Sequence, residues 1–235
     1  MLRMASQNDV KETSETETTN SVMEKENAAR KGITRPPLNF LPILKEAGIP
    51  IEISSPDKLC ERLYQGVFVE GNKKKFYVDK NLNKNGYVLF PKALYICWGD
   101  TPKYWKWNTE KDMSGEDIQV AELLNVCWLE IRSSFRTITL TPGTQYEIVF
   151  VIMIKEFNNM SNCELLLTIH PPKEKAVSRR QYLKEYPLNK WVEMQVGVFW
   201  MKPENVGGLS FSLEEYSSFW KKGLVVKCVF IRPKN

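Results

Sequence analysis

Tyr146-Glu147-Ile148-Val149-Phe150-Val151-Ile152-Met153-Ile154 is a continuous run without glycine or proline in which every even-numbered side chain is apolar. Apolar side chains that recur every second residue are typical of a β-strand. Most odd-numbered positions of the run are apolar as well, so both faces of the strand require cover. We therefore expect this segment to be a central strand, buried along most of its length.

Segments on both sides of this run show the same strand pattern and are separated by polar turns. The expected strands are Val67–Val69, Lys75–Val78, Tyr87–Phe90, Val126–Ile131, Cys163–Ile169, Lys190–Phe199, Leu209–Glu215 and Leu224–Ile231. Many short strands without alternating helical crossovers are typical of sheet-on-sheet architectures. The sequence therefore predicts an all-β fold, an antiparallel jelly-roll-like β-sandwich.

Three parts precede the first strand: a polar extension, a Pro-rich arm and a short helix that opens the folded domain. Residues 1–35 are polar and charged with few bulky apolar side chains, which predicts a disordered amino-terminal extension. In residues 36–53 prolines alternate with apolar residues, which indicates an extended Pro-rich arm that docks on the domain. Ser55, Pro56 and Asp57 then predict one short helix that ends at Gly66. The β-sandwich domain is accordingly expected over residues 54–235.

Composition narrows the classes of function. The net charge of the chain is +5, which permits weak attraction to polyanions without requiring it. The five Cys are scattered and His170 is the single His, so we expect no zinc site, no other cofactor and no catalytic centre. Most of the Cys lie in apolar segments and are expected to be buried, although the odd count leaves one thiol for an intermolecular bond. With no secretory signal and no membrane span in sight, we expect a cytoplasmic or nucleocytoplasmic protein.

The stretch Ile96–Trp107, which reads ICWGDTPKYWKW, combines three Trp and a Tyr with turn-forming residues. Because Gly99, Asp100 and Pro102 break regular structure, Trp98 is expected to end a strand and the following aromatic residues to lie on a turn. Large rings on a loop usually contact a ligand. The alternative is structural, since Trp is mostly buried and such rings also cap a core.

Glu215 stands at the end of the expected strand Leu209–Glu215 and shares the inward-facing parity of its apolar residues. A carboxylate with that parity lies exposed at the edge of the sandwich or is held by a partner. It can assist a ligand site at the strand ends, or it can be a simple solvated charge.

Three segments, Ile96–Trp107, Val126–Ile131 and Phe219–Lys234, resemble the phloem protein 2 family of plants, whose carbohydrate-binding members are the Nictaba-related lectins. The similarity runs in order from about Leu59 to the end of the chain. It implies a jelly-roll lectin that binds N-acetylglucosamine oligomers (chitooligosaccharides) and the chitobiose core of N-glycans on glycoproteins, as a homodimer and without metal. It also implies a location in phloem sieve elements, a role in plant defence, and association with a phloem filament protein through Cys.

The resemblance extends to the residues that bind sugar. Two Trp seven residues apart carry binding in those lectins and match Trp98 and Trp105, and the second of two assisting Glu matches Glu215. The first of those Glu falls on Gly208, so one acceptor is missing. Sugar rings have apolar faces that lie on aromatic planes, and their hydroxyls need acceptors. The predicted carbohydrate-binding residues are Trp98, Tyr104, Trp105, Asp100 and Glu215.

Two other functions remain open from the sequence. An RNA-binding phloem transport protein would use the same rings to stack bases, with Lys103, Lys106, Lys111 and the stretch from Lys173 to Arg180 facing phosphates. A disulfide-linked structural component of phloem filaments would depend on the Cys and the Pro-rich arm. Affinity that falls steeply with salt would favour RNA over sugar.

Overall fold

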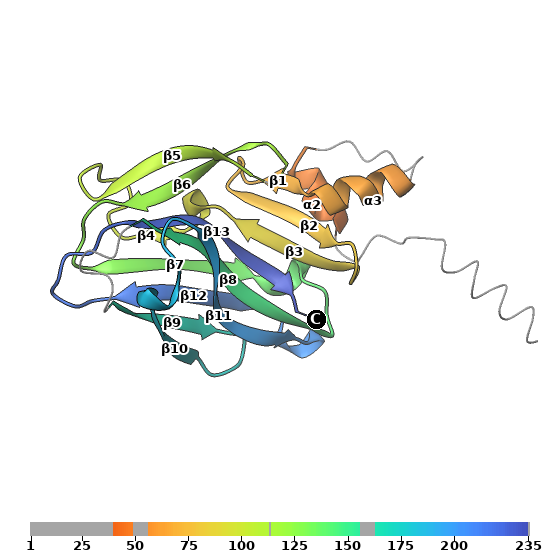
Figure 1. The fold of residues 1–235 in the computed structure, drawn as a ribbon. Coiled ribbons are helices and arrows are strands. Elements are labelled where there is room, and N and C mark those ends of the chain that lie inside the picture. The colour runs from red at the N-terminus through yellow and green to blue at the C-terminus, as the bar shows by residue number, and fades with distance from the viewer. Residues whose placement is uncertain (1–39, 49–55, 113, 156–162, 235) are drawn as a thin grey trace, which may run out of the picture. The chain divides into compact units, whose positions relative to one another are not determined.

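The computed structural model describes residues 40–48, 56–112, 114–155 and 163–234. These residues fall within one compact unit, Pro36–Asn235. The predicted disordered extension, residues 1–35, and most of the predicted arm lie outside the described residues. Figure 1 shows the arrangement of strands and helices.

Two short helices precede the strands. Helix α2 (Phe40–Glu46) buries Ile43 and Leu44, so the extended conformation predicted for the arm is wrong over this part. Pro42 is compatible with the helix because it lies in the first turn, where a missing N–H breaks no hydrogen bond. Helix α3 (Pro56–Gln65) confirms the predicted helix and ends at Gly66, whose φ is 87°. Neither helix of the described part is long and apolar enough to cross a membrane.

The larger sheet has eight strands and branches at β13. Strand β13 pairs with β8 along one edge, while its other edge pairs with β3 and then with β6. Strand β11 pairs with the far edge of β8. The bounds are β1 (Val67–Val69), β2 (Lys74–Asp79), β3 (Lys84–Leu89), β5 (Trp105–Lys111), β6 (Asp117–Leu123), β8 (Thr144–Ile154), β11 (Trp191–Met201) and β13 (Leu224–Pro233).

The smaller sheet has five antiparallel strands in the order β10-β9-β12-β7-β4. Their bounds are β10 (Val177–Tyr182), β9 (Glu164–His170), β12 (Gly208–Glu215), β7 (Leu129–Arg136) and β4 (Tyr95–Ile96). Short 3₁₀ turns cover Pro91–Ala93, Thr137–Thr139, Leu183–Glu185 and Pro203–Asn205. The described strands therefore form an antiparallel β-sandwich, as the sequence predicts.

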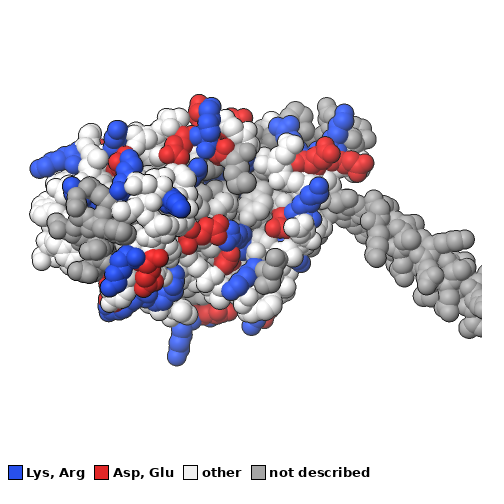
Figure 2. All heavy atoms as spheres, viewed as in Figure 1, with Lys and Arg blue, Asp and Glu red and all other residues white. Residues whose placement is uncertain are grey.

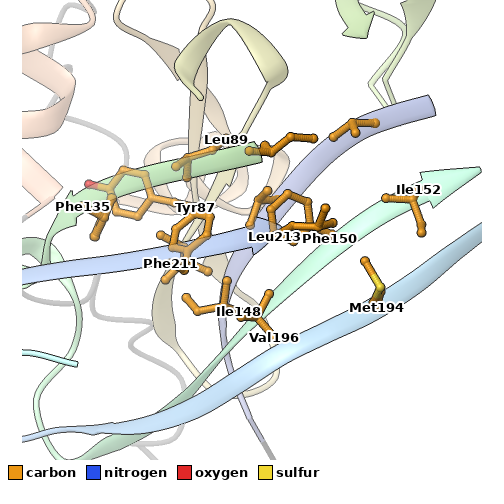
Figure 3. Close-up of a cluster of buried hydrophobic side chains, with 14 of the residues drawn as sticks. Tyr87, Leu89, Phe135, Ile148, Phe150, Ile152, Met194, Val196, Phe211 and Leu213 are labelled. Atoms are coloured by element: carbon orange, nitrogen blue, oxygen red, sulfur yellow. The ribbon is translucent and has the colours of Figure 1, made fainter. Parts of the chain in front are cut away.

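The core lies between the inner faces of the two sheets (Figure 3). Phe150 of β8 meets Phe211 of β12 edge to face, with ring centroids 6.0 Å apart. Tyr87 of β3 packs on Phe135 of β7 in the same way at 4.8 Å. Such aromatic contacts join the two sheets and add to the burial of apolar area that stabilises the fold.

The run that starts the sequence analysis is strand β8, which pairs with neighbours on both edges and buries all its even-numbered side chains. The prediction of a central strand is confirmed. Strands β5, β6 and β10 were not predicted. Two of them, β5 and β10, are edge strands rich in charged and polar residues, and edge strands do not need two apolar faces.

Candidate functional site

The aromatic stretch forms a tight turn between β4 and β5. The Gly99 N–H donates to the Ile96 carbonyl at 2.9 Å, and the Thr101 N–H donates to the Trp98 carbonyl at 2.9 Å. Trp98 has a φ of 55°, in the left-handed region that a bulky residue rarely adopts. Such strain persists only where the surroundings enforce it, and it is common at ligand sites.

Two rings of this turn are presented together at the surface. The Trp98 side chain is 48% exposed and lies against the half-buried Tyr104, with ring centroids 5.4 Å apart. Asp100, between them in sequence, is exposed. The structure therefore brings together Trp98 and Tyr104 of the predicted set, whereas Asp100 lines a separate surface hollow with Trp105 and Trp107.

Trp105 and Trp107 point the other way and anchor the turn. Trp105 is only 2% exposed, and its indole N–H donates to the Cys97 carbonyl at 3.0 Å. The indole N–H of Trp107 donates to the Gly99 carbonyl at 2.8 Å. The expected surface position of Trp105 is thus wrong, because the first residue of β5 turns its ring into the core.

Glu215 keeps the inward parity that the sequence predicts and is held by a partner. Its carboxylate forms an ion pair with Lys221, and its Oε1 accepts the Ser217 N–H at 3.1 Å. Lys221 is completely buried and also donates to the carbonyls of Cys127, Ser217 and Phe219. Burial lowers the pKa of Lys221. In the part of the chain that the structure describes, no hydrogen bond or ion pair links Glu215 to Trp98 or Tyr104.

A second pair of exposed rings was missed by sequence reasoning. Trp128 and Tyr216 are 46% and 44% exposed, and their ring centroids are 4.2 Å apart. The Trp128 indole N–H donates to Glu130 Oε2 at 3.2 Å, and the carbonyl of Glu130 accepts the Cys97 N–H at 3.0 Å. The available signal was that Tyr216 directly follows the predicted strand Leu209–Glu215; Trp128 was placed inside the predicted strand Val126–Ile131, but the observed strand β7 starts only at Leu129.

Gly208, which takes the place of a Glu in the resembling lectins, lies at the opposite end of β12 from Glu215. Seven residues of extended chain span about 23 Å, and an odd separation turns the two side chains to opposite faces of the sheet. A Cβ at Gly208 would meet no atom within 4 Å. One small sugar unit therefore cannot contact side chains at both positions.

The thiols and carboxylates show no further site in the described residues, where no group of three or more His, Cys, Asp or Glu could hold a metal ion. None of the five Cys, all of which lie in the described residues, forms a disulfide, and Cys60, Cys163 and Cys228 are buried. Burial raises the pKa of Cys163 to about 11 and that of Cys228 to about 12, so these thiols stay protonated near neutral pH.

The family model and the related sequences agree on one family. The family model described as Phloem protein 2 matches residues 84–233. The protein PHLOEM PROTEIN 2-LIKE A1 of Arabidopsis thaliana is 40% identical over 203 residues, covering 85% of this chain and 82% of that protein. A lectin of Luffa acutangula is 30% identical over 199 residues, covering 84% and 94%. Among solved structures, a xylan-binding domain of Paenibacillus barcinonensis aligns with a TM-score of 0.33 and 13% identity, over 62% of this chain and 85% of that domain.

Proposed function

This chain belongs to the phloem protein 2 family, and from that premise we propose that it is a lectin for N-acetylglucosamine oligomers. The related protein of Luffa acutangula that is named a lectin supports carbohydrate binding. The observation that carries the proposal is the exposed ring pair Trp98–Tyr104 on a turn held from beneath by two indole hydrogen bonds. A rigid aromatic surface of this kind suits the apolar face of a sugar ring.

The predicted site residues take two roles in this proposal. Trp98 and Tyr104 contact the sugar ring, and the exposed carboxylate of Asp100 accepts hydrogen bonds from its hydroxyls or amide N–H. Trp105 and Glu215 act as positioning residues, because the indole of Trp105 holds the Cys97 carbonyl and the carboxylate of Glu215 is paired with Lys221.

The ligands proposed are chitooligosaccharides and the chitobiose core of N-glycans on glycoproteins. Contacts at an exposed turn bind a single sugar unit weakly, so affinity is gained by longer chains and by two sites in a homodimer. Binding requires no cofactor in this scheme. The family name supports a location in phloem, and the cytoplasm of sieve elements is the compartment proposed.

Mixed charges on one face of the molecule support sugar over RNA. Figure 2 shows Lys and Arg interspersed with Asp and Glu over the face in view, without a continuous basic track among the described residues of that face. A single-stranded polyanion would need such a track beside the stacking rings. The filament hypothesis depends on accessible thiols, and Cys97 and Cys127 are the two that are partly exposed.

The experiment that tests the proposal is calorimetric titration of chitotriose into folded wild-type protein, Trp98→Ala and Trp200→Ala. Trp200 is a matched control because it is 50% exposed but lies in β11, which pairs with β8 and with neither strand that flanks the Trp98 turn. Loss of the ring contact should weaken binding in Trp98→Ala by at least about tenfold, whereas Trp200→Ala should stay within about twofold of wild type. Equal affinities for the two variants would contradict the assignment.

A further inference from the structure

A groove of about 460 Å³ runs over the outward face of the five-stranded sheet. The odd-numbered side chains of β7 and β12, such as Ile131 and Leu213, are buried in the core, so the even-numbered ones face outward. Three cross-strand pairs form the floor of the groove, namely Glu130 with Glu214, Arg132 with Ser212, and Ser134 with Ser210. The groove is therefore built from regular strands and not from loops.

The floor of the groove offers both donors and acceptors for hydrogen bonds. The hydroxyl groups of Ser134, Ser210 and Ser212 have no hydrogen-bond partner among the residues that the structure describes. Arg132 Nε and Glu130 Oε1 are linked at 3.2 Å, and Glu130 Oε2 accepts the Trp128 indole N–H, so the terminal guanidinium nitrogens of Arg132 are the donors that this pair leaves for a ligand. A ligand with many hydroxyl groups can both donate to and accept from such a surface.

Aromatic rings border the groove on two sides. Tyr95 of β4 lines it and is 48% exposed, with the Arg132 guanidinium 4.4 Å from its ring centroid. At the end of β12, Tyr216 and Trp128 form the second exposed ring pair. Burial and the nearby carboxylates of Glu214 and Glu130 raise the pKa of Tyr216, so its hydroxyl remains a donor. Rings beside a polar floor suit the alternating apolar faces and hydroxyl edges of a sugar chain.

The Trp98 turn follows directly on β4, the strand whose Tyr95 lines the groove. Tyr95 precedes Trp98 by three residues, and the Cys97 N–H between them binds the carbonyl of Glu130 in the floor. From Ser210 to Tyr216 the extended chain covers roughly 20 Å, which is longer than one sugar ring. A chain that starts on Trp98 can thus reach several positions along the sheet.

We propose that this groove binds the further sugar units of a neutral oligosaccharide whose first unit rests on Trp98 and Tyr104. The inference rests on the proposed lectin function and assigns it an extended site. The charged side chains of the floor are two carboxylates and one guanidinium, and their net negative charge does not attract a polyanion. Affinity should accordingly depend on the length of the oligosaccharide.

The test compares chitobiose with chitotetraose by calorimetry, or by competition where the heat is small. Tyr95→Ala removes a ring that borders the groove, and Ser210→Tyr fills the floor with a side chain that suits a strand. Thr109→Tyr is the matched control because it places the same ring on an exposed position of β5, in the other sheet. Thermal unfolding establishes that each variant is folded.

We expect wild type and Thr109→Tyr to bind chitotetraose at least about tenfold more tightly than chitobiose. Tyr95→Ala and Ser210→Tyr should lose most of this gain while their affinity for chitobiose is unchanged. If both groove variants keep the wild-type gain, the groove assignment is overturned and the Trp98 site stands. If folded wild type binds neither sugar, both the extended site and the proposed function are overturned.

Discussion

Lys221 is completely buried, which is rare for a Lys and requires partners for its charge. Its ammonium group is surrounded by the Glu215 carboxylate and three backbone carbonyls, which together hold the chain after β12 in place. Removing one member of a buried ion pair leaves the other charge unpaired and is strongly destabilising.

Lys221→Met should therefore lower the free energy of unfolding by about 3–5 kcal/mol, measured by chemical denaturation. Lys175→Met, at an exposed position, serves as the control and should change the free energy by less than about 0.5 kcal/mol. A loss below about 1 kcal/mol in Lys221→Met would contradict the view that this ion pair fixes the end of β12.

Gly208 provides a gain-of-function prediction. Its position lies on the outward face of β12, opposite Arg136, and has open space for a side chain. In Gly208→Glu the new carboxylate extends the polar row of the groove, and one added hydrogen bond to a sugar is worth about 0.5–1.5 kcal/mol. We expect a roughly two- to tenfold gain for chitotetraose and none for chitobiose, measured by calorimetry. Gly208→Ala, without the carboxylate, should show no gain; a gain there, or for chitobiose, would contradict the geometry.

At the residue scale, the sequence predicted well whether a side chain faces the core or the solvent within a regular strand. It did so poorly across the turn from Trp98 to Trp105. The inward direction of Glu215 follows from strand alternation, but its partner Lys221 arrives from a separate segment that no local pattern connects to it. Trp98 and Trp105 could not be told apart because Gly99, Asp100 and Pro102 interrupt the two-residue period between them.

At the scale of elements, the hairpin of β5 and β6 is fastened to β2 by Lys75, which donates to both Asp112 and Ser114. Lys75 Nζ lies 2.8 Å from Asp112 Oδ2, and both side chains are 9% exposed. Burial alone would raise the pKa of Asp112, but hydrogen bonds from Lys75, Ser114 and the backbone lower it to about 2. The ionised carboxylate is thus more stable in the folded state than in the unfolded chain.

This shift predicts the pH dependence of stability. Because the folded pKa of Asp112 lies below its unfolded value, its contribution is complete above about pH 4 and is lost as the pH falls toward 2. Asp112→Asn should lower the free energy of unfolding near neutral pH by about 1–3 kcal/mol and flatten the acid dependence between those limits. Asp117→Asn, whose ion pair with Lys111 is 65% exposed on both sides, is the control. An unchanged acid slope in Asp112→Asn would refute this role.

Whether an element was predicted or missed depended on the strength of its apolar pattern. Strands such as β8, β12 and β13 carry apolar faces that only a buried strand explains, and each was found. Strands β5 and β10 were missed because, at the edge of a sheet, backbone pairing is enough to hold residues such as Lys, Arg and Glu in a strand. Helix α2 was missed because Pro42 suggests an extended chain, although proline is tolerated in a first turn.

At the scale of the whole molecule, the sandwich was predictable and the groove was not. Alternating segments predict antiparallel sheets, but the division of strands between two sheets depends on pairings between distant parts of the sequence. The order β9-β12-β7-β4 brings His170, Ser210, Glu130 and Tyr95 to one surface. In the sequence these residues are spread over about half of the chain.

The molecule as a whole carries mixed charges, and its proposed ligand is neutral. Binding should then be nearly insensitive to salt, whereas contacts with phosphates release counterions and weaken steeply as salt rises. The titration of folded wild-type protein with chitotriose at low and high salt tests the central claim most directly. The account predicts saturable binding whose dissociation constant changes by less than about twofold between the two conditions. Absence of binding in both calorimetry and an independent assay, or an affinity that falls steeply with salt, would contradict it.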